Sequence, residues 1–144
     1  MGRMKAVTPI ERQFKKQYAA DLLEIARQDL QTAEALIKAV GIRPENILYH
    51  LEQAIEKSLK AVLCHQGKPV PLHHVLFGII QRFPDTALPP GGYALVDLTP
   101  FATIRRYVIA DEVIEQQEVA QALDTAKEVV DWATEKIGSK GKAS

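Results

Sequence analysis

Hydrophobic residues recur at helical spacing along most of the chain, most clearly in the segment from Pro44 to Gly67. At about 100° per residue, one broad apolar face is formed by Ile47, Leu48, Leu51, Ala54, Ile55, Ser58, Leu59, Ala61 and Val62. A narrow polar stripe on the opposite side is formed by Tyr49, Gln53, Glu56 and Lys60. The stripe has two interpretations. It is either a solvated face, stiffened by a Glu56–Lys60 pair worth about 0.3–0.5 kcal/mol, or the lining of a groove.

The preceding segment also has a helical pattern. Thr8, Pro9 and Glu11 fit an N-cap, a first helical residue and a capping box, and Gly41 offers a stop. We therefore expect a helix that runs to Val40, with residues 1–17 as an N-terminal helical extension. Its predicted buried stripe is Tyr18, Leu22, Ile25, Ala26, Ala33, Leu36, Ile37 and Val40.

Shorter helical patterns follow. Residues 75–83 predict a third helix that Pro84 ends, residues 84–92 a long loop, and residues 93–109 a helix that restarts at Thr99–Pro100. The last helix is expected over about 114–137, followed by a disordered tail at 138–144. Because no strand pattern competes, the sequence predicts an all-α fold, an up-and-down bundle of four or five helices over residues 18–137.

Composition narrows the possible functions. The 144 residues include 18 basic and 18 acidic side chains, so no basic footprint predicts strong non-specific binding to nucleic acid. The single cysteine, Cys64, cannot form an internal disulfide, which favours a reducing compartment. No segment approaches the about 18 apolar residues that a membrane span needs. We expect a cytoplasmic protein that does not enter a membrane.

One carboxylate interrupts the apolar stripe of the first helix. Asp29 is costly to bury unless it is paired or hydrogen-bonded. We favour a structural role for Asp29, as a helix cap or the partner of a cation, over a catalytic one.

Five short motifs occur in an order found in one known family. They are Ala26-x-x-Asp29-Leu30-x-x-Ala33, then Tyr49 with Gln53-Ala54-x-Glu56-Lys57-x-Leu59-Lys60-Ala61, then Pro71-x-His73-His74-x-Leu76, Arg106-Tyr107, and Ala122-x-x-x-Ala126. With these motifs, residues 18–137 resemble the HEPN family, the "higher eukaryotes and prokaryotes nucleotide-binding" domain. The resemblance implies a four- or five-helix bundle, usually a homodimer from bacteria or archaea. It also implies a minimal nucleotidyltransferase as partner, in a toxin–antitoxin-like pair, and an ATP-like nucleotide as a possible ligand, with no cofactor required.

The chain departs from the family pattern at two places. Val75 stands where the family usually has an acid after the histidine, and Val108 stands where it has a proline after Arg106-Tyr107. Many HEPN domains are metal-independent ribonucleases with an Arg, a polar residue and a His a few positions later, near the C-terminal helix. Here all four histidines precede residue 75, and the one pair with suitable spacing, Arg43 and His50, has Pro44 after the arginine. We predict no catalytic residue and no metal site.

The candidate ligand-binding residues are Arg106, Tyr107, His74, Lys57, Lys60, Tyr49, Gln53 and Glu56. Arg106 could pair with Asp29 or bind a phosphate bidentately. Three functions remain open. The first choice is a nucleotide- or partner-binding module that acts with a nucleotidyltransferase. The alternatives are a toxin with atypical metal-independent ribonuclease activity, and a structural dimerisation module that has no ligand.

Overall fold

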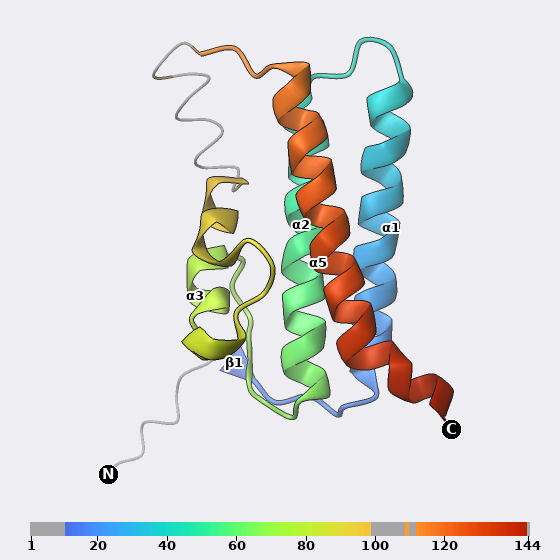
Figure 1. Cartoon of the computed structure of the whole chain (residues 1–144), viewed down its shortest axis with the longest axis vertical. Coiled ribbons are helices and arrows are strands. Elements are labelled where there is room, and N and C mark those ends of the chain that lie inside the picture. Colours follow the sequence, from blue (N-terminus) through green and yellow to red (C-terminus); the bar gives the residue numbers. More distant parts are fainter. Residues whose placement is uncertain (1–10, 99–108, 110–111, 144) are drawn as a thin grey trace.

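The fold is built on three long α-helices and a two-stranded sheet. A computed structural model describes residues 11–98, 109 and 112–143. Its elements, in chain order, are β1 (Glu11–Arg12), α1 (Tyr18–Lys38), α2 (Pro44–His65), β2 (Val70–Pro71), α3 (Leu76–Ile80), the 3₁₀ helices η2 (Asp85–Ala87) and η3 (Gly92–Leu98), and α5 (Gln116–Ala143) (Figure 1). The predicted all-α bundle is confirmed.

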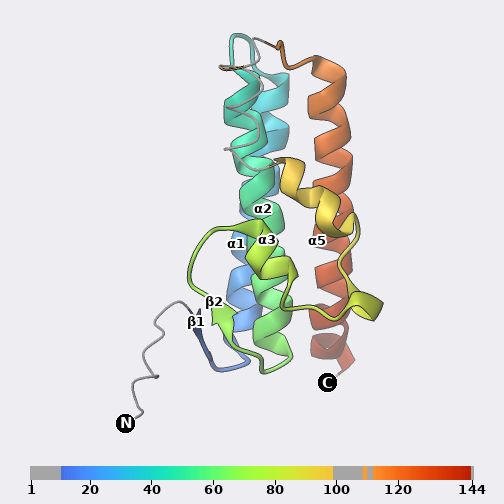
Figure 2. The ribbon, with the colours of Figure 1, turned by 90° about the vertical axis from the view of Figure 1, so that its left-hand side faces the viewer.

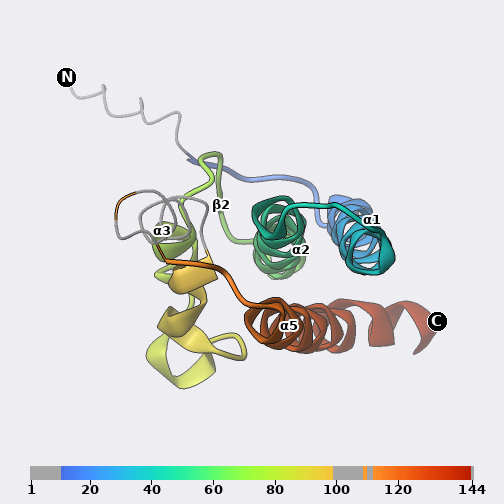
Figure 3. The ribbon, with the colours of Figure 1, turned by 90° about the horizontal axis from the view of Figure 1, so that it is seen from above.

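Helix α2 lies at the centre of the bundle. It contacts α1, α5, α3, η3 and β2, and the view from above places α1, α5 and α3 around it (Figure 3). Helices α1 and α2 are antiparallel, whereas α5 runs in the same direction as α2 (Figure 1). The elements α3 and η3, which follow α2 in the chain, lie on the side of α2 opposite α1 (Figure 3).

Local signals explain where α2 begins and ends. Pro44 occupies the first turn, where its missing N–H costs nothing. After the helix, Gly67 takes a left-handed φ of 74°, which lets the Lys68 N–H donate to the Leu63 carbonyl at 3.0 Å. Because neighbours cover it on several sides, most residues of α2 are buried.

Helix α1 turns to the core only part of the face that its pattern predicts. Small residues and one leucine are buried, namely Ala19, Leu23, Ala26 and Ala33. Of the predicted stripe, Tyr18, Ile25, Ile37 and Val40 are instead exposed, so the prediction is wrong for these four. Alanines allow the close approach of α1 to α2, and this packing leaves the larger side chains at the surface.

The chain before α1 is not helical where the structure describes it. Glu11 and Arg12 pair antiparallel with Pro71 and Val70, and α1 begins only at Tyr18. The predicted helical extension is therefore wrong over residues 11–17, because backbone pairing with β2 replaces the helical hydrogen bonds. Figure 2 shows this two-stranded sheet beside the α1–α2 pair, near the end where α2 finishes.

At the C-terminus the observed helix is longer than predicted. Helix α5 continues to Ala143, so the predicted disordered tail is wrong over residues 138–143. A glycine ends a helix when it adopts a positive φ, and Gly138 does not. The predicted helix restart at Thr99–Pro100 lies outside the described residues. Over the described part of the chain, no helix combines the length and the apolarity that crossing a membrane requires.

Candidate functional site

The polar stripe of α2 is largely buried. Glu56 has none of its surface exposed and Lys60 only 7%, while Tyr49 remains 48% exposed. The interpretation as a solvated face is therefore wrong for Glu56 and Lys60. An ionised pair in this position has lost its hydration, so it must find its hydrogen bonds within the protein.

These hydrogen bonds connect α2 to the loop before α3. Glu56 Oε2 accepts from Lys60 Nζ at 2.9 Å and lies 2.6 Å from His74 Nδ1. Lys60 Nζ also donates to the His73 carbonyl at 2.8 Å. A carboxylate oxygen can only accept, so His74 carries its proton on Nδ1 and leaves Nε2 for another partner. The loop thus takes its position from buried charges on α2.

His73 is held separately. Its Nδ1 accepts from the Val75 N–H at 3.2 Å, and its ring lies against Gly78, where an added Cβ would come within 2.9 Å of Cε1. His73 therefore contributes its backbone carbonyl to the charged network, and its side chain shapes the loop.

A second buried carboxylate, Glu52, lies one turn before Glu56. It is 1% exposed, and its Oε1 accepts from Gln53 Nε2 at 2.9 Å. Burial, with the charge of Glu56 as a smaller cause, raises the pKa of Glu52 to about 7. The sequence analysis missed this residue. The available signal was two acids at i and i+4 on one helix, an arrangement that is unfavourable without a compensating environment.

Two openings follow each other along this side of α2. The first, the polar pocket, has a volume of about 260 Å³ and is lined by Tyr49, Glu52, Gln53 and His74. The second, the α1 groove, has a volume of about 600 Å³. It is lined by Arg12, Phe14, Tyr18, Asp21, Leu22, Ile25, Lys57, Lys60, Val70, Pro71 and Leu72.

The α1 groove combines aromatic, apolar and cationic side chains. Phe14 and Tyr18 meet edge to face with ring centroids 6.3 Å apart, and the Arg12 guanidinium lies 5.7 Å from the Phe14 centroid. Lys57 Nζ donates to Gln53 Oε1 at 2.9 Å. Within the described chain, neither Arg12 nor Lys57 forms an ion pair with a carboxylate. Two cations therefore stand beside an apolar surface.

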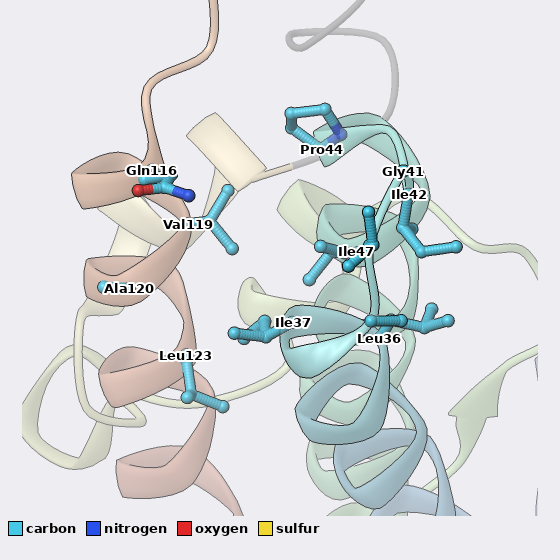
Figure 4. A pocket seen from close by; sticks show the side chains of 12 residues that line it. Leu36, Ile37, Gly41, Ile42, Pro44, Ile47, Gln116, Val119, Ala120 and Leu123 are labelled. Atoms are coloured by element: carbon cyan, nitrogen blue, oxygen red, sulfur yellow. The ribbon is translucent and has the colours of Figure 1, made fainter.

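A third cleft lies at the far end of the bundle, between the α1–α2 connection and the first turns of α5 (Figure 4). It has a volume of about 640 Å³, and the side chains that line it are apolar apart from that of Gln116. Its side chains include Ile37, Ile47, Val119 and Leu123, with the amide of Gln116 at its edge. None of the predicted site residues lines it.

The structure divides the predicted site residues between the two openings. Tyr49, Gln53 and His74 line the polar pocket, Lys57 and Lys60 line the α1 groove, and Glu56 is buried beside them. Arg106 and Tyr107 lie outside the described residues, so their predicted contacts stay predictions.

Asp29 has a described partner that the sequence analysis did not name. Its Oδ1 lies 3.6 Å from His50 Nδ1. Arg43, the other member of the pair with ribonuclease-like spacing, forms an ion pair with Glu45 at 3.2 Å.

Metal ligands do not gather in the part of the chain that the structure describes: no three His, Cys, Asp or Glu side chains there could share an ion. The chemistry of the two openings is that of hydrogen bonding, charge and stacking.

Comparison with known proteins agrees with the fold. The model of the HEPN domain matches residues 19–137, and the chain belongs to the HEPN-domain family. A similar solved structure is the crystal structure of TT1696 from Thermus thermophilus, which is 25% identical. The similarity covers 83% of this chain and 98% of that one, with a TM-score of 0.66. No curated protein matches the chain significantly.

Proposed function

We propose that this protein is a HEPN-type nucleotide-binding module and that the nucleotide lies in the α1 groove. One observation carries the proposal. The groove places two cations, Arg12 and Lys57, beside an aromatic and apolar surface. Small-molecule sites have this character, with volumes of about 300–1,000 Å³ and a few charged groups among apolar ones.

Different side chains of the groove bind the base and the phosphates of the nucleotide. The base stacks on the aromatic and apolar wall at Phe14 and Tyr18, and such stacking contributes about 1–3 kcal/mol per base. Lys57 and Arg12 attract the phosphates. Lys60 takes no direct part, since Glu56 and the His73 carbonyl already occupy its ammonium.

Isothermal titration with ATP and AMP tests this assignment. Tyr18→Ala removes an aromatic ring on which the base stacks. It is expected to lower the affinity for both nucleotides at least about fivefold. Lys57→Gln is expected to lower the affinity for ATP more than that for AMP, because it removes a positive charge that attracts the additional phosphates of ATP. Lys136→Gln, an exposed site on α5, is the matched control and should change neither. Equal affinities in wild type and Tyr18→Ala would refute the groove as the site.

The proposal also includes a partner. The membership of the HEPN family supports action with a minimal nucleotidyltransferase, as in toxin–antitoxin-like pairs, and a homodimer as the working unit. Co-expression with a nucleotidyltransferase encoded beside this chain, followed by size-exclusion chromatography with light scattering, tests both points. Co-elution at a defined stoichiometry supports the pair, and separate elution of two intact proteins refutes it.

Metal-independent RNA cleavage is a second candidate, favoured by the 2.6 Å contact between His74 Nδ1 and buried Glu56. A carboxylate that orients an imidazole leaves Nε2 able to transfer a proton. Incubation of a labelled RNA in EDTA tests this candidate, and the activity should vanish in His74→Ala. If the protein neither binds nucleotide nor cleaves RNA, the remaining alternative is a structural dimerisation module.

A further inference from the structure

The polar pocket contains a buried charge that the nucleotide proposal does not use. Glu52 has only 1% of its surface exposed, yet it accepts only one hydrogen bond, from Gln53 to Oε1. Within the described chain, Oε2 has no hydrogen-bond or ion-pair partner. Oε2 is not among the described side-chain atoms that are both fully enclosed and without a partner, so this oxygen meets the opening that Glu52 lines. A ligand that enters the pocket can therefore donate to Oε2.

The nearby cations do not supply that donor. Lys57 Nζ donates to Gln53 Oε1 at 2.9 Å. Lys60 Nζ is held by Glu56 and by the His73 carbonyl, and His74 Nδ1 faces Glu56. Among the residues that the structure describes, these three side chains are thus committed to acceptors other than Glu52.

The walls of the pocket suit a positively charged group. Tyr49 presents a ring that is 48% exposed, and an aromatic face attracts ammonium and guanidinium groups. Glu52 and Gln53 provide acceptor oxygens on the same helix, one turn beyond Tyr49. The volume of about 260 Å³ falls below the range usual for a nucleotide-sized ligand and suits a small head group.

We infer that the polar pocket is a binding site for a small organic cation, an amine or a guanidine, which donates to Glu52 and lies against Tyr49. The site is separate from the α1 groove. A phosphate is disfavoured there because Glu52 and Glu56 would repel it. A metal ion is disfavoured because the described residues offer no group of three suitable ligands.

Binding is expected to depend on pH. The cation requires ionised Glu52, whose pKa is about 7 in the empty pocket. The charged groups that face Glu52 are Glu56, Lys57 and Lys60 on α2, with His74 on the wall of the pocket. From the ionisation of Glu52 alone, affinity should rise about tenfold from pH 6 to pH 8.

Isothermal titration with agmatine, which carries an amine and a guanidinium, tests the inference on the full chain. Glu52→Gln keeps the shape of the side chain and removes its charge. This substitution is expected to lower the affinity for agmatine about 10- to 100-fold, the usual effect of losing a hydrogen bond to a charged group. Glu128→Gln, an exposed acid on α5, is the matched control. Circular dichroism establishes that each variant is folded.

Two further arms separate this site from the nucleotide site. Tyr49→Leu should weaken agmatine, whereas Tyr18→Ala in the α1 groove should leave agmatine affinity unchanged. The inference is overturned if wild type does not bind agmatine at pH 8, or if Glu52→Gln binds it as tightly as wild type. Loss of agmatine binding in Tyr18→Ala would overturn the separation of the two sites. None of these outcomes depends on whether ATP binds.

Discussion

The buried Glu56–Lys60 pair offers a sharp test of how α2 holds the loop before α3. Lys60→Met keeps an unbranched side chain of similar length and removes the ammonium. The bonds that the ammonium makes to Glu56 Oε2 and to the His73 carbonyl, at 2.9 and 2.8 Å, are then lost. Of its described partners, Glu56, which has none of its surface exposed, then keeps His74 alone.

The expected cost follows from leaving a carboxylate buried without its cation. Removing one member of a buried pair usually costs about 3–5 kcal/mol. Because His74 Nδ1 remains 2.6 Å from Glu56 Oε2, we expect the lower end, about 3 kcal/mol. The double variant Glu56→Gln/Lys60→Met leaves no uncompensated charge and should recover part of this loss.

Urea unfolding followed by Trp132 fluorescence measures these free energies, because this ring is half-buried and packs on Phe83 with centroids 5.7 Å apart. Lys127→Met is the matched control. Its ion pair with Glu34 spans 3.3 Å, but the two side chains are 47% and 38% exposed, so its loss should cost less than about 1 kcal/mol. If Lys60→Met costs no more than Lys127→Met, the burial argument is refuted.

Three further measurements test the packing and ionisation of the core. Because the pKa of Glu52 rises from 4.5 unfolded to about 7 folded, its contribution to the free energy of unfolding is present below pH 4.5 and is lost as pH rises through 7. That loss is on the order of 3 kcal/mol. In urea titrations between pH 5 and 8, the range in which Glu52 ionises in the folded protein, Glu52→Gln should abolish this fall of the free energy of unfolding with pH. Ala26 is fully buried, so Ala26→Leu should overpack α1 and lower the free energy of unfolding by about 1–3 kcal/mol, and an unchanged midpoint would contradict that packing. Burial raises the pKa of Cys64, so its reaction with a disulfide reagent at pH 8 should be slow until urea unfolds the chain, and fast labelling of the native protein would argue against the buried position.

Much of the fold was predictable because local signals and hydrophobic spacing agree. Pro44 begins α2 as expected, and Gly41 and Gly67 adopt the positive φ values predicted for helix ends. The pattern failed on α1, where a stripe of large residues competed with buried alanines. Periodicity identifies an amphipathic helix, but it does not state which of two apolar edges meets the neighbouring helix.

The candidate site was less predictable. The recurrence of Tyr49, Gln53, Glu56 and Lys60 pointed to the helix that borders both openings, and His74 was named from its motif. Glu52 was missed because its burial depends on the central position of α2, which no local signal reveals. Val75 stands where the family usually has an acid after the histidine, and in the structure the carboxylate beside His74 comes from Glu56 on α2.

The sequence alone determined the helices, most of their ends and the family. These features depend on residues close together in the chain, through caps, glycine conformations and helical spacing. The tertiary structure decided which face of α1 is buried, that residues 11 and 12 pair with β2, and that Glu52, Glu56 and Lys60 lose contact with water. Burial is a property of all the elements that surround a side chain. The same stripe that would be solvated on an outer helix therefore becomes a charged network when α2 lies at the centre.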